Sequence, residues 1–232
     1  MLAFIDTETT GFLNADHVIE VAAVVVSPDC RRLYATYDSV LPPHDDDNGQ
    51  CRQALLRQWA SDNACHGLQP DTFSEIVRDA SPKARQRVLE SLIATLSQCH
   101  TIVGHNLDFD LRMLANTGGP AGQWFKDLKD GRMPRFKLVD TLQRRSAING
   151  KAESLQSLYQ RLGSGRLDAY QHSALGDCLR LYEIFTFLPT ASLISQEINE
   201  DATFGINTAF SRFDDLTKHN MLKDLGFMLI SR

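Results

Sequence analysis

Two carboxylates stand one residue apart near the start of the sequence. Asp6 and Glu8 follow a short apolar run in the segment FIDTETTGF, residues 4–12. In a strand, side chains two positions apart share a face, so both acids project to one side while Thr7 projects to the other. Like charges this close repel each other and raise a pKa unless a cation lies between them. Hard divalent cations such as Mg²⁺ or Mn²⁺ are the usual partners of clustered carboxylates.

This stretch alone leaves a simpler interpretation open, in which one acid caps the turn at residues 9–11 and the other is solvated. Two later segments add titratable groups. In VGHNLDFDLRML, residues 103–114, Asp110 falls in the first turn of a predicted helix, where it would also complement the helix dipole. In QHSALGDCLRLYEIF, residues 171–185, His172 precedes a predicted helix and Asp177 lies inside it, near an apolar stripe. An acid beside an apolar stripe needs a partner.

An order of strands and helices must bring these segments together. Apolar runs and alternation predict strands at residues 2–5, 17–26, 31–41, 101–103 and 137–139, and helical spacing predicts helices at residues 53–59, 83–96, 107–115, 153–162 and 173–187. Asp140 and Thr141 have the pattern of an N-cap for a further helix. Three strands followed by alternating strands and helices indicate an α/β fold with a mixed sheet. Ligands of such sheets tend to bind at the carboxyl ends of strands, where Asp6 and Glu8 lie.

The composition is that of an ordinary soluble domain. The chain has 232 residues, of which 43% are hydrophobic and 23% charged, which suits one α/β domain. No apolar run approaches the roughly 20 residues that span a bilayer, and no basic region precedes the first apolar run, so we predict a cytoplasmic protein that does not contact membranes. Scattered cysteines without a CxxC pair predict reduced thiols.

Taken in order, FIDTETTG, HNLDFD and HSALGD resemble the three exonuclease motifs of the DEDDh 3′–5′ exonucleases, which include polymerase proofreading subunits, RNase T and oligoribonuclease. CHGL at residues 65–68 and VDTL at residues 139–142 resemble two further segments of that family. The resemblance covers residues 1–188 and implies a ribonuclease-H-like fold with a central five-stranded mixed sheet flanked by helices. Residues 189–232 then form a C-terminal extension, which we expect to pack on the domain or on a partner, including a second copy of the chain.

The resemblance also implies a role for each residue of the motifs. Four acids would hold two Mg²⁺ or Mn²⁺ ions, and these are Asp6, Glu8, Asp110 and Asp177. Two such ions can stabilise both the attacking and the leaving oxygen of a phosphodiester displacement. His172 would be the general base, since a histidine with a pKa of about 6.5 can accept a proton near neutral pH. Asp108 competes with Asp110, but the Phe-Asp step of the motif favours Asp110 and leaves Asp108 as a solvated acid at the helix start.

A set of substrate-binding residues follows from the same resemblance, namely Thr9, Thr10, Gly11, Phe12, His66 and Asn106. Residues 9–12 match positions that grip and wedge the terminal nucleotide, and apolar surfaces such as Phe12 can stack on any base. Core packing remains an equal alternative for Phe12, and turn packing for His66. We interpret His105 and Asn106 as bracing the strand end rather than touching a metal ion.

The predicted function is a metal-dependent 3′–5′ exonuclease. It would remove nucleoside 5′-monophosphates from the 3′ end of single-stranded nucleic acid, with DNA slightly favoured over RNA. The rival hypothesis is a catalytically inactive module of the same fold that binds nucleic acid or protein. The formal net charge of −5 argues against a polyanionic partner, but metal ions reverse the local sign and basic residues gather between residues 126 and 166. We predict that this basic stretch borders the substrate groove, with a solvated charged face as the alternative.

Overall fold

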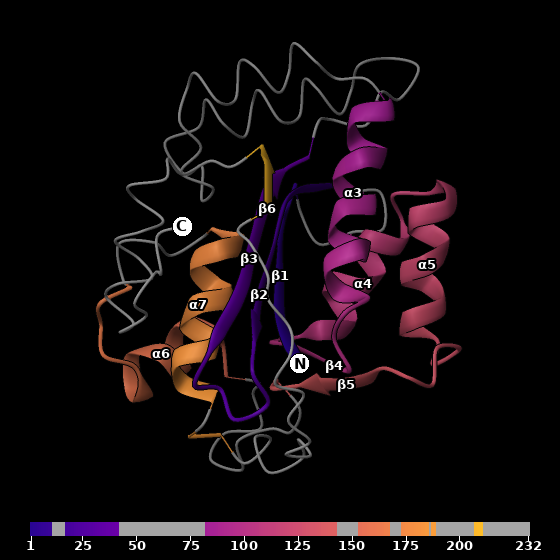
Figure 1. The fold of residues 1–232 in the computed structure, drawn as a ribbon. Helices are drawn as coiled ribbons and strands as arrows, with labels where there is room; N and C mark the ends of the chain where they lie inside the picture. Colours follow the sequence, from indigo (N-terminus) through magenta and orange to yellow (C-terminus); the bar gives the residue numbers. More distant parts are fainter. Residues whose placement is uncertain are drawn as a thin grey trace, which may run out of the picture.

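A mixed β-sheet between two layers of helices forms the centre of the protein. The computed structural model describes residues 1–10, 17–41, 82–142, 153–167, 173–185, 187–188 and the backbone of residues 207–210. The elements in these ranges are β1 (Leu2–Thr9), β2 (Val18–Val26), β3 (Leu33–Val40), α3 (Pro82–Leu96), β4 (Thr101–Gly104), α4 (Leu107–Ala115), α5 (Gly119–Lys129), β5 (Lys137–Asp140), α6 (Leu155–Leu162), α7 (Ala174–Phe185) and β6 (Asn207–Phe210). Figure 1 shows their arrangement.

The strands lie in the order β5-β4-β1-β2-β3-β6. β2 runs antiparallel to both β1 and β3, while β4 is parallel to β1 and β5 is parallel to β4. These five strands confirm the predicted α/β fold with a mixed sheet. The sixth strand, β6, was not predicted: it pairs in parallel with β3 from a segment beyond residue 188. β6 has only four residues, which is too short for its sequence periodicity to identify a strand. Its pairing depends on the edge of β3, which only the folded chain presents.

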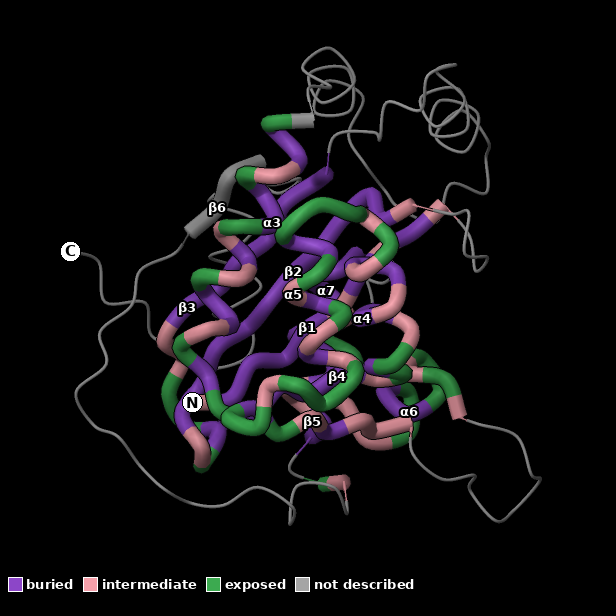
Figure 2. Tube along the Cα trace, turned by 90° about the vertical axis from the view of Figure 1, so that its right-hand side faces the viewer, coloured by how far each residue is buried: buried purple, intermediate pink, exposed green. Residues whose placement is uncertain are grey.

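The two faces of the sheet follow from the alternation of side chains along β1. Ala3 and Ile5 face the layer of α3, α4 and α5, whereas Leu2 and Phe4 face α6 and α7 (Figure 1). β2 is buried along its whole length because helices cover both faces, which explains its nearly continuous apolar sequence. Figure 2 shows this buried strand region behind the partly exposed helices.

β1 extends past the apolar run at residues 2–5 as far as Thr9, because β2 supplies pairing partners as far as Val18. Asp6 and Glu8 therefore lie within the strand, as their assumed alternation requires. α5 was missed because Gly118, Gly119 and Pro120 together suggest a loop. In the structure the proline occupies the first turn of the helix, where its missing N–H is harmless. The helices predicted at residues 53–59 and after Asp140 lie outside the described residues.

No helix in the part of the chain that the structure describes is long and apolar enough to cross a membrane. Three cysteines fall within that part, and Cys30, Cys99 and Cys178 are all buried free thiols.

Candidate metal centre

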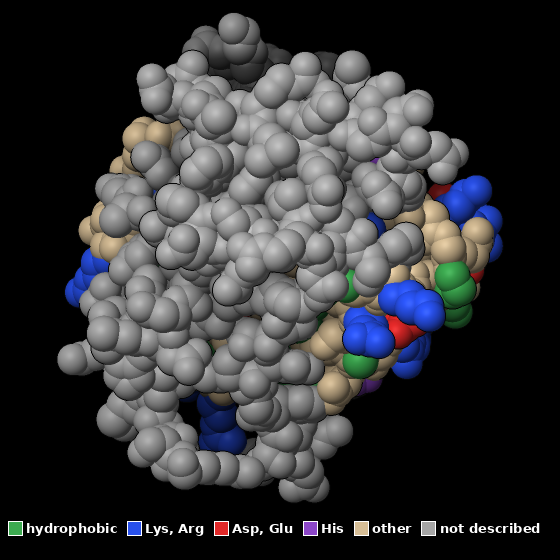
Figure 3. All heavy atoms as spheres, turned by 90° about the horizontal axis from the view of Figure 1, so that it is seen from above, with side chains coloured by type: hydrophobic (Ala, Val, Ile, Leu, Met, Phe, Trp, Pro, Cys, Tyr) green, Lys and Arg blue, Asp and Glu red, His purple; other side chains and the backbone are tan. Residues whose placement is uncertain are grey.

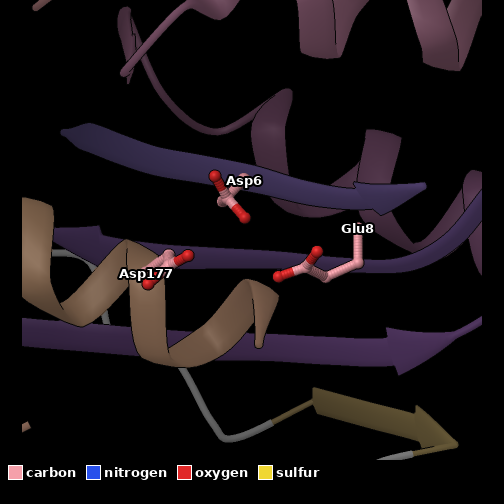
Figure 4. Close-up of side chains that lie close together, drawn as sticks. All are labelled: Asp6, Glu8 and Asp177. Carbon is pink, nitrogen blue, oxygen red and sulfur yellow. The ribbon is translucent and has the colours of Figure 1, made fainter. Parts of the chain in front are cut away.

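Three carboxylates meet between β1 and α7. Asp6 and Glu8 project from the same face of β1, and Asp177 projects from the first turn of α7. One oxygen of each lies within 4.8 Å of the others, and Figure 4 shows the three side chains pointing toward one another. All three residues keep partial exposure, so a ligand from solvent can reach them. Three hard oxygen donors in this arrangement fit a divalent cation such as Mg²⁺ or Mn²⁺.

Aromatic packing fixes the helix that brings Asp177 to the strand. The ring of Phe4 in β1 makes edge contacts with Phe185 and Tyr182 of α7, at centroid distances of 5.1 and 5.7 Å. At the start of the helix the Ser173 hydroxyl accepts the Gly176 N–H at 3.0 Å, which satisfies one of the free donors of the first turn. The position of Asp177 is therefore set by contacts along the full length of α7.

The acids disfavour one another's charge when no cation is present. Desolvation by the surrounding protein raises the pKa of Asp6 well above its ordinary value, and the negative charges of Asp110, Asp177 and Glu8 raise it further. Glu20, which lies opposite Glu8 on β2 and is buried, adds to the same effect. A divalent cation would offset this repulsion, so the electrostatics of the site also fit a bound metal ion.

Asp110 lies beside Thr7 rather than within the group of three. Its Oδ1 accepts hydrogen bonds from the Thr7 hydroxyl at 2.7 Å and from the Thr7 N–H at 3.1 Å. Thr7 points away from Asp6 and Glu8, toward α4, and this explains the separation. Only 3% of Asp110 is exposed, and burial raises its pKa to about 8 although the bonds from Thr7 oppose the shift. Of the neighbouring charges, Asp110 raises the pKa of Asp6 most, so it belongs to the same electrostatic unit.

Asp108 behaves differently from Asp110, although both lie in the first turn of α4. Its side chain is 70% exposed and forms an ion pair with Lys129 Nζ at 3.0 Å. The burial of Asp110 next to β1 and the exposure of Asp108 favour the assignment of Asp110 to the site.

The segment before α4 is held by side chains at the ends of β4 and β5. The two ring nitrogens of His105 lie 3.0 Å from Thr141 Oγ1 and 2.9 Å from the Glu153 carbonyl oxygen. Asp140 Oδ1 accepts the N–H of Asn106 at 2.9 Å, and Asn106 has a left-handed backbone with φ of 73° just before the helix. Burial lowers the pKa of His105, which favours its neutral form. His105 and Asn106 therefore brace the end of β4. A substrate contact by Asn106 remains a prediction.

The remaining predicted site residues are described only in part. Thr9 follows a shift in the pairing register after Glu8, and Thr10 pairs with His17: the Thr10 N–H donates to the His17 carbonyl, and the Thr10 hydroxyl accepts the His17 N–H. Four predicted site residues lie outside the described part of the chain, namely Gly11, Phe12, His66 and His172. Their roles stay predictions.

Acids pair with three of the bases in the described part of the basic stretch. Ion pairs join Lys129 to Asp108, Arg132 to Asp127 and Asp130, and Arg161 to Glu153. Figure 3 shows Lys and Arg side chains with Asp and Glu side chains among them on the right-hand side, where α3, α4 and α5 lie in Figure 1. These pairs favour a solvated charged face for the described part, while Arg144 and Arg145 lie outside it.

Sequence reasoning missed Thr7 and Arg180. Thr7 was expected only to face away from the acids, and its contact with Asp110 depends on the docking of α4. Arg180 interrupts the apolar run ALGDCLRLYEIF three positions after Asp177, a spacing that allows contact along a helix. A cation within an apolar stripe, close to a predicted site acid, is a sequence signal by which Arg180 could have been found.

The comparison with known proteins identifies the fold of the chain. No family model matches the chain, and no curated protein does. A solved structure of exonuclease X in complex with 5′ overhanging duplex DNA matches with a TM-score of 0.50 and 22% identity, over 85% of this chain and 96% of that one. A full-length 3′-exonuclease gives a TM-score of 0.45 and 16% identity, over 80% of each chain. The likeness to the exonuclease X structure confirms the predicted fold class: this chain has a ribonuclease-H-like α/β fold.

Proposed function

We propose that the protein is a metal-dependent 3′–5′ exonuclease acting on single-stranded nucleic acid. The observation that carries the proposal is the group formed by Asp6, Glu8 and Asp177, with Asp110 adjacent. The fold is also that of a protein, exonuclease X, whose structure holds DNA. The three motifs of the sequence resemble those of the DEDDh exonucleases, and the resemblance implies a metal-binding role for these same acids.

The four acids would hold two Mg²⁺ or Mn²⁺ ions. When bound, such ions acidify a water molecule and stabilise charge on phosphate oxygens. The chain itself orients the acids: the pleat of β1 aligns Asp6 with Glu8, α7 supplies Asp177, and Thr7 fixes Asp110 through two hydrogen bonds. His172 would accept the proton of the attacking water, and its removal is expected to lower the rate by about 10²–10⁴-fold.

Digestion of a single-stranded DNA oligonucleotide labelled at its 5′ end tests the activity. With Mg²⁺, we expect progressive shortening from the 3′ end and release of nucleoside 5′-monophosphates. Asp6→Ala should abolish this digestion and His172→Ala should slow it by about 10²–10⁴-fold, whereas Asp108→Asn, which removes an exposed acid from the second motif, should retain it. Undiminished digestion by either Ala variant would sink the proposal. Oligonucleotide binding without any cleavage in Mg²⁺ or Mn²⁺ would favour the inactive binding module.

A second digestion addresses the preference for DNA. Matched single-stranded DNA and RNA oligonucleotides are compared under the same conditions, with duplexes as further substrates. We expect the single strands to be cut faster than the duplexes and DNA slightly faster than RNA. Faster digestion of RNA would reverse the preference without affecting the metal site, since contacts to the 2′-hydroxyl decide it.

A further inference from the structure

A buried arginine touches the candidate metal centre from inside the protein. Arg180 lies on α7 and is 2% exposed. One of its terminal nitrogens donates to Asp177 Oδ1 at 3.3 Å, and its Nε donates to the Leu167 carbonyl oxygen at 3.2 Å. Its guanidinium carbon lies 5.0 Å from the centre of the Tyr159 ring. Three separate groups thus hold this one side chain in place.

The position of the arginine relative to the acids gives it more than a packing role. Burial of a charge is strongly unfavourable unless a partner offsets it, and Asp177 is such a partner. Asp177 is also one of the three carboxylates that each bring one oxygen within 4.8 Å of the others. The ion pair restricts the rotamers of Asp177, because a carboxylate held by a buried donor cannot turn freely.

The second contact of Arg180 reaches the chain between α6 and α7. Leu167 is held at both its backbone groups, since Arg180 binds its carbonyl oxygen and the Tyr159 hydroxyl accepts its N–H at 3.1 Å. The Tyr159 hydroxyl in turn donates to Glu183 of α7 at 2.8 Å. In the sequence, His172 follows Leu167 by five positions. The contact therefore fixes the backbone of Leu167, the last described residue before the predicted base in the sequence.

We propose that Arg180 is a positioning residue of the nuclease site, an inference that rests on the proposed function. Its guanidinium orients the carboxylate of Asp177 toward Asp6 and Glu8 and anchors the Leu167 carbonyl at the same time. The planar fork of arginine donates in fixed directions and can serve both acceptors, whereas a lysine ammonium is a single point of charge.

The direction of the effect on metal binding separates positioning from simple charge. A nearby positive charge repels a divalent cation, so a purely electrostatic role predicts tighter Mn²⁺ binding when Arg180 is neutralised. Positioning predicts weaker binding, because Asp177 loses its fixed orientation. Loss of partners that orient metal ligands typically weakens metal affinity or activity by about 10- to 100-fold.

The experiment compares Arg180→Gln and Arg180→Lys with Arg161→Gln in the full chain. Arg161 is an exposed arginine that pairs with Glu153, so its substitution is a matched loss of charge. Isothermal titration with Mn²⁺ should show affinity about 10- to 100-fold weaker for Arg180→Gln, partly restored by Arg180→Lys and unchanged for Arg161→Gln. With the oligonucleotide and saturating Mn²⁺, kcat should fall in Arg180→Gln while KM stays nearly constant.

Tyr159→Phe distinguishes positioning from general loosening of this region. It removes the hydroxyl bonds to Glu183 and Leu167 but leaves the Arg180–Asp177 contact, so its Mn²⁺ affinity should match that of the wild type. Unchanged or tighter Mn²⁺ binding by Arg180→Gln, or an equal loss in Tyr159→Phe, overturns the inference. If Arg180→Gln does not fold, Arg180→Lys decides, and wild-type Mn²⁺ affinity in that variant overturns it.

Titration with Mn²⁺ needs no substrate, so the two proposals fail separately. A wild-type protein that binds Mn²⁺ through Arg180-dependent geometry but digests no oligonucleotide would refute the nuclease function and retain the positioning role. A wild-type protein that binds no Mn²⁺ would overturn both.

Discussion

Replacing Asp6 by Asn is expected to stabilise the metal-free protein. One oxygen each from Asp6, Glu8 and Asp177 lies within 4.8 Å of the others. At an effective dielectric constant of about 20, two charges at that separation repel by about 3 kcal/mol. Partial exposure of the acids and the raised pKa of Asp6 reduce the repulsion, so we expect a gain of about 1–3 kcal/mol in the free energy of unfolding. An amide of nearly the same shape removes the charge without leaving a cavity.

Thermal and urea denaturation in EDTA at pH 8 measure this gain. For a chain of this size, each kcal/mol corresponds to a shift of about 2–4 °C in Tm. Mg²⁺ should then raise the Tm of the wild type, because a ligand that binds only the folded state stabilises it, and should raise that of Asp6→Asn much less. Glu90→Gln is the matched control, since Glu90 is an exposed acid on α3, and it should leave both quantities unchanged.

Two results would refute this reasoning. If Asp6→Asn were less stable than the wild type in EDTA, the carboxylate would be making a favourable contact instead of a repulsive one. If Mg²⁺ stabilised Asp6→Asn as much as the wild type, Asp6 would not be a ligand of the ion.

Three further predictions concern the surroundings of the site. Burial raises the pKa of Asp110 to about 8, above its unfolded value, so the folded state binds this proton more tightly. The stability of the metal-free protein should therefore fall as the pH rises from about 4 to 8, and urea titrations in EDTA that show no such fall would contradict the shift. Thr7→Val removes the 2.7 Å hydrogen bond to Asp110 and should cost about 1–3 kcal/mol, whereas Thr7→Ser keeps the hydroxyl and should cost less. Gly122→Ala would place a Cβ 2.7 Å from the Ala115 carbonyl oxygen, forcing α5 away from α4 and costing about 1–3 kcal/mol in a denaturant titration. Wild-type stability in Gly122→Ala would mean that the two helices are not packed so closely.

Local patterns were enough to predict much of the scaffold. The sequence of β2, apolar at every position except Glu20, predicted a strand covered on both faces, because such a strand tolerates a nearly continuous apolar sequence. The helical spacing of residues 107–115 predicted α4 with the bounds that the structure has. Patterns of this kind act over a few residues and require no knowledge of the rest of the chain. They failed for α5, whose glycines and proline resemble a loop, and for β6, which takes its partner from β3.

The sequence alone also determined that Asp6 and Glu8 share a face, since the pleat of any strand places side chains two positions apart on one side. Only the tertiary structure decided which groups these acids meet. Asp177 reaches them through the packing of α7 on Phe4, and Asp110 reaches Thr7, 103 positions away in the sequence, through the docking of α4. Contacts between distant segments depend on how whole helices bury their apolar faces, and no local pattern records that.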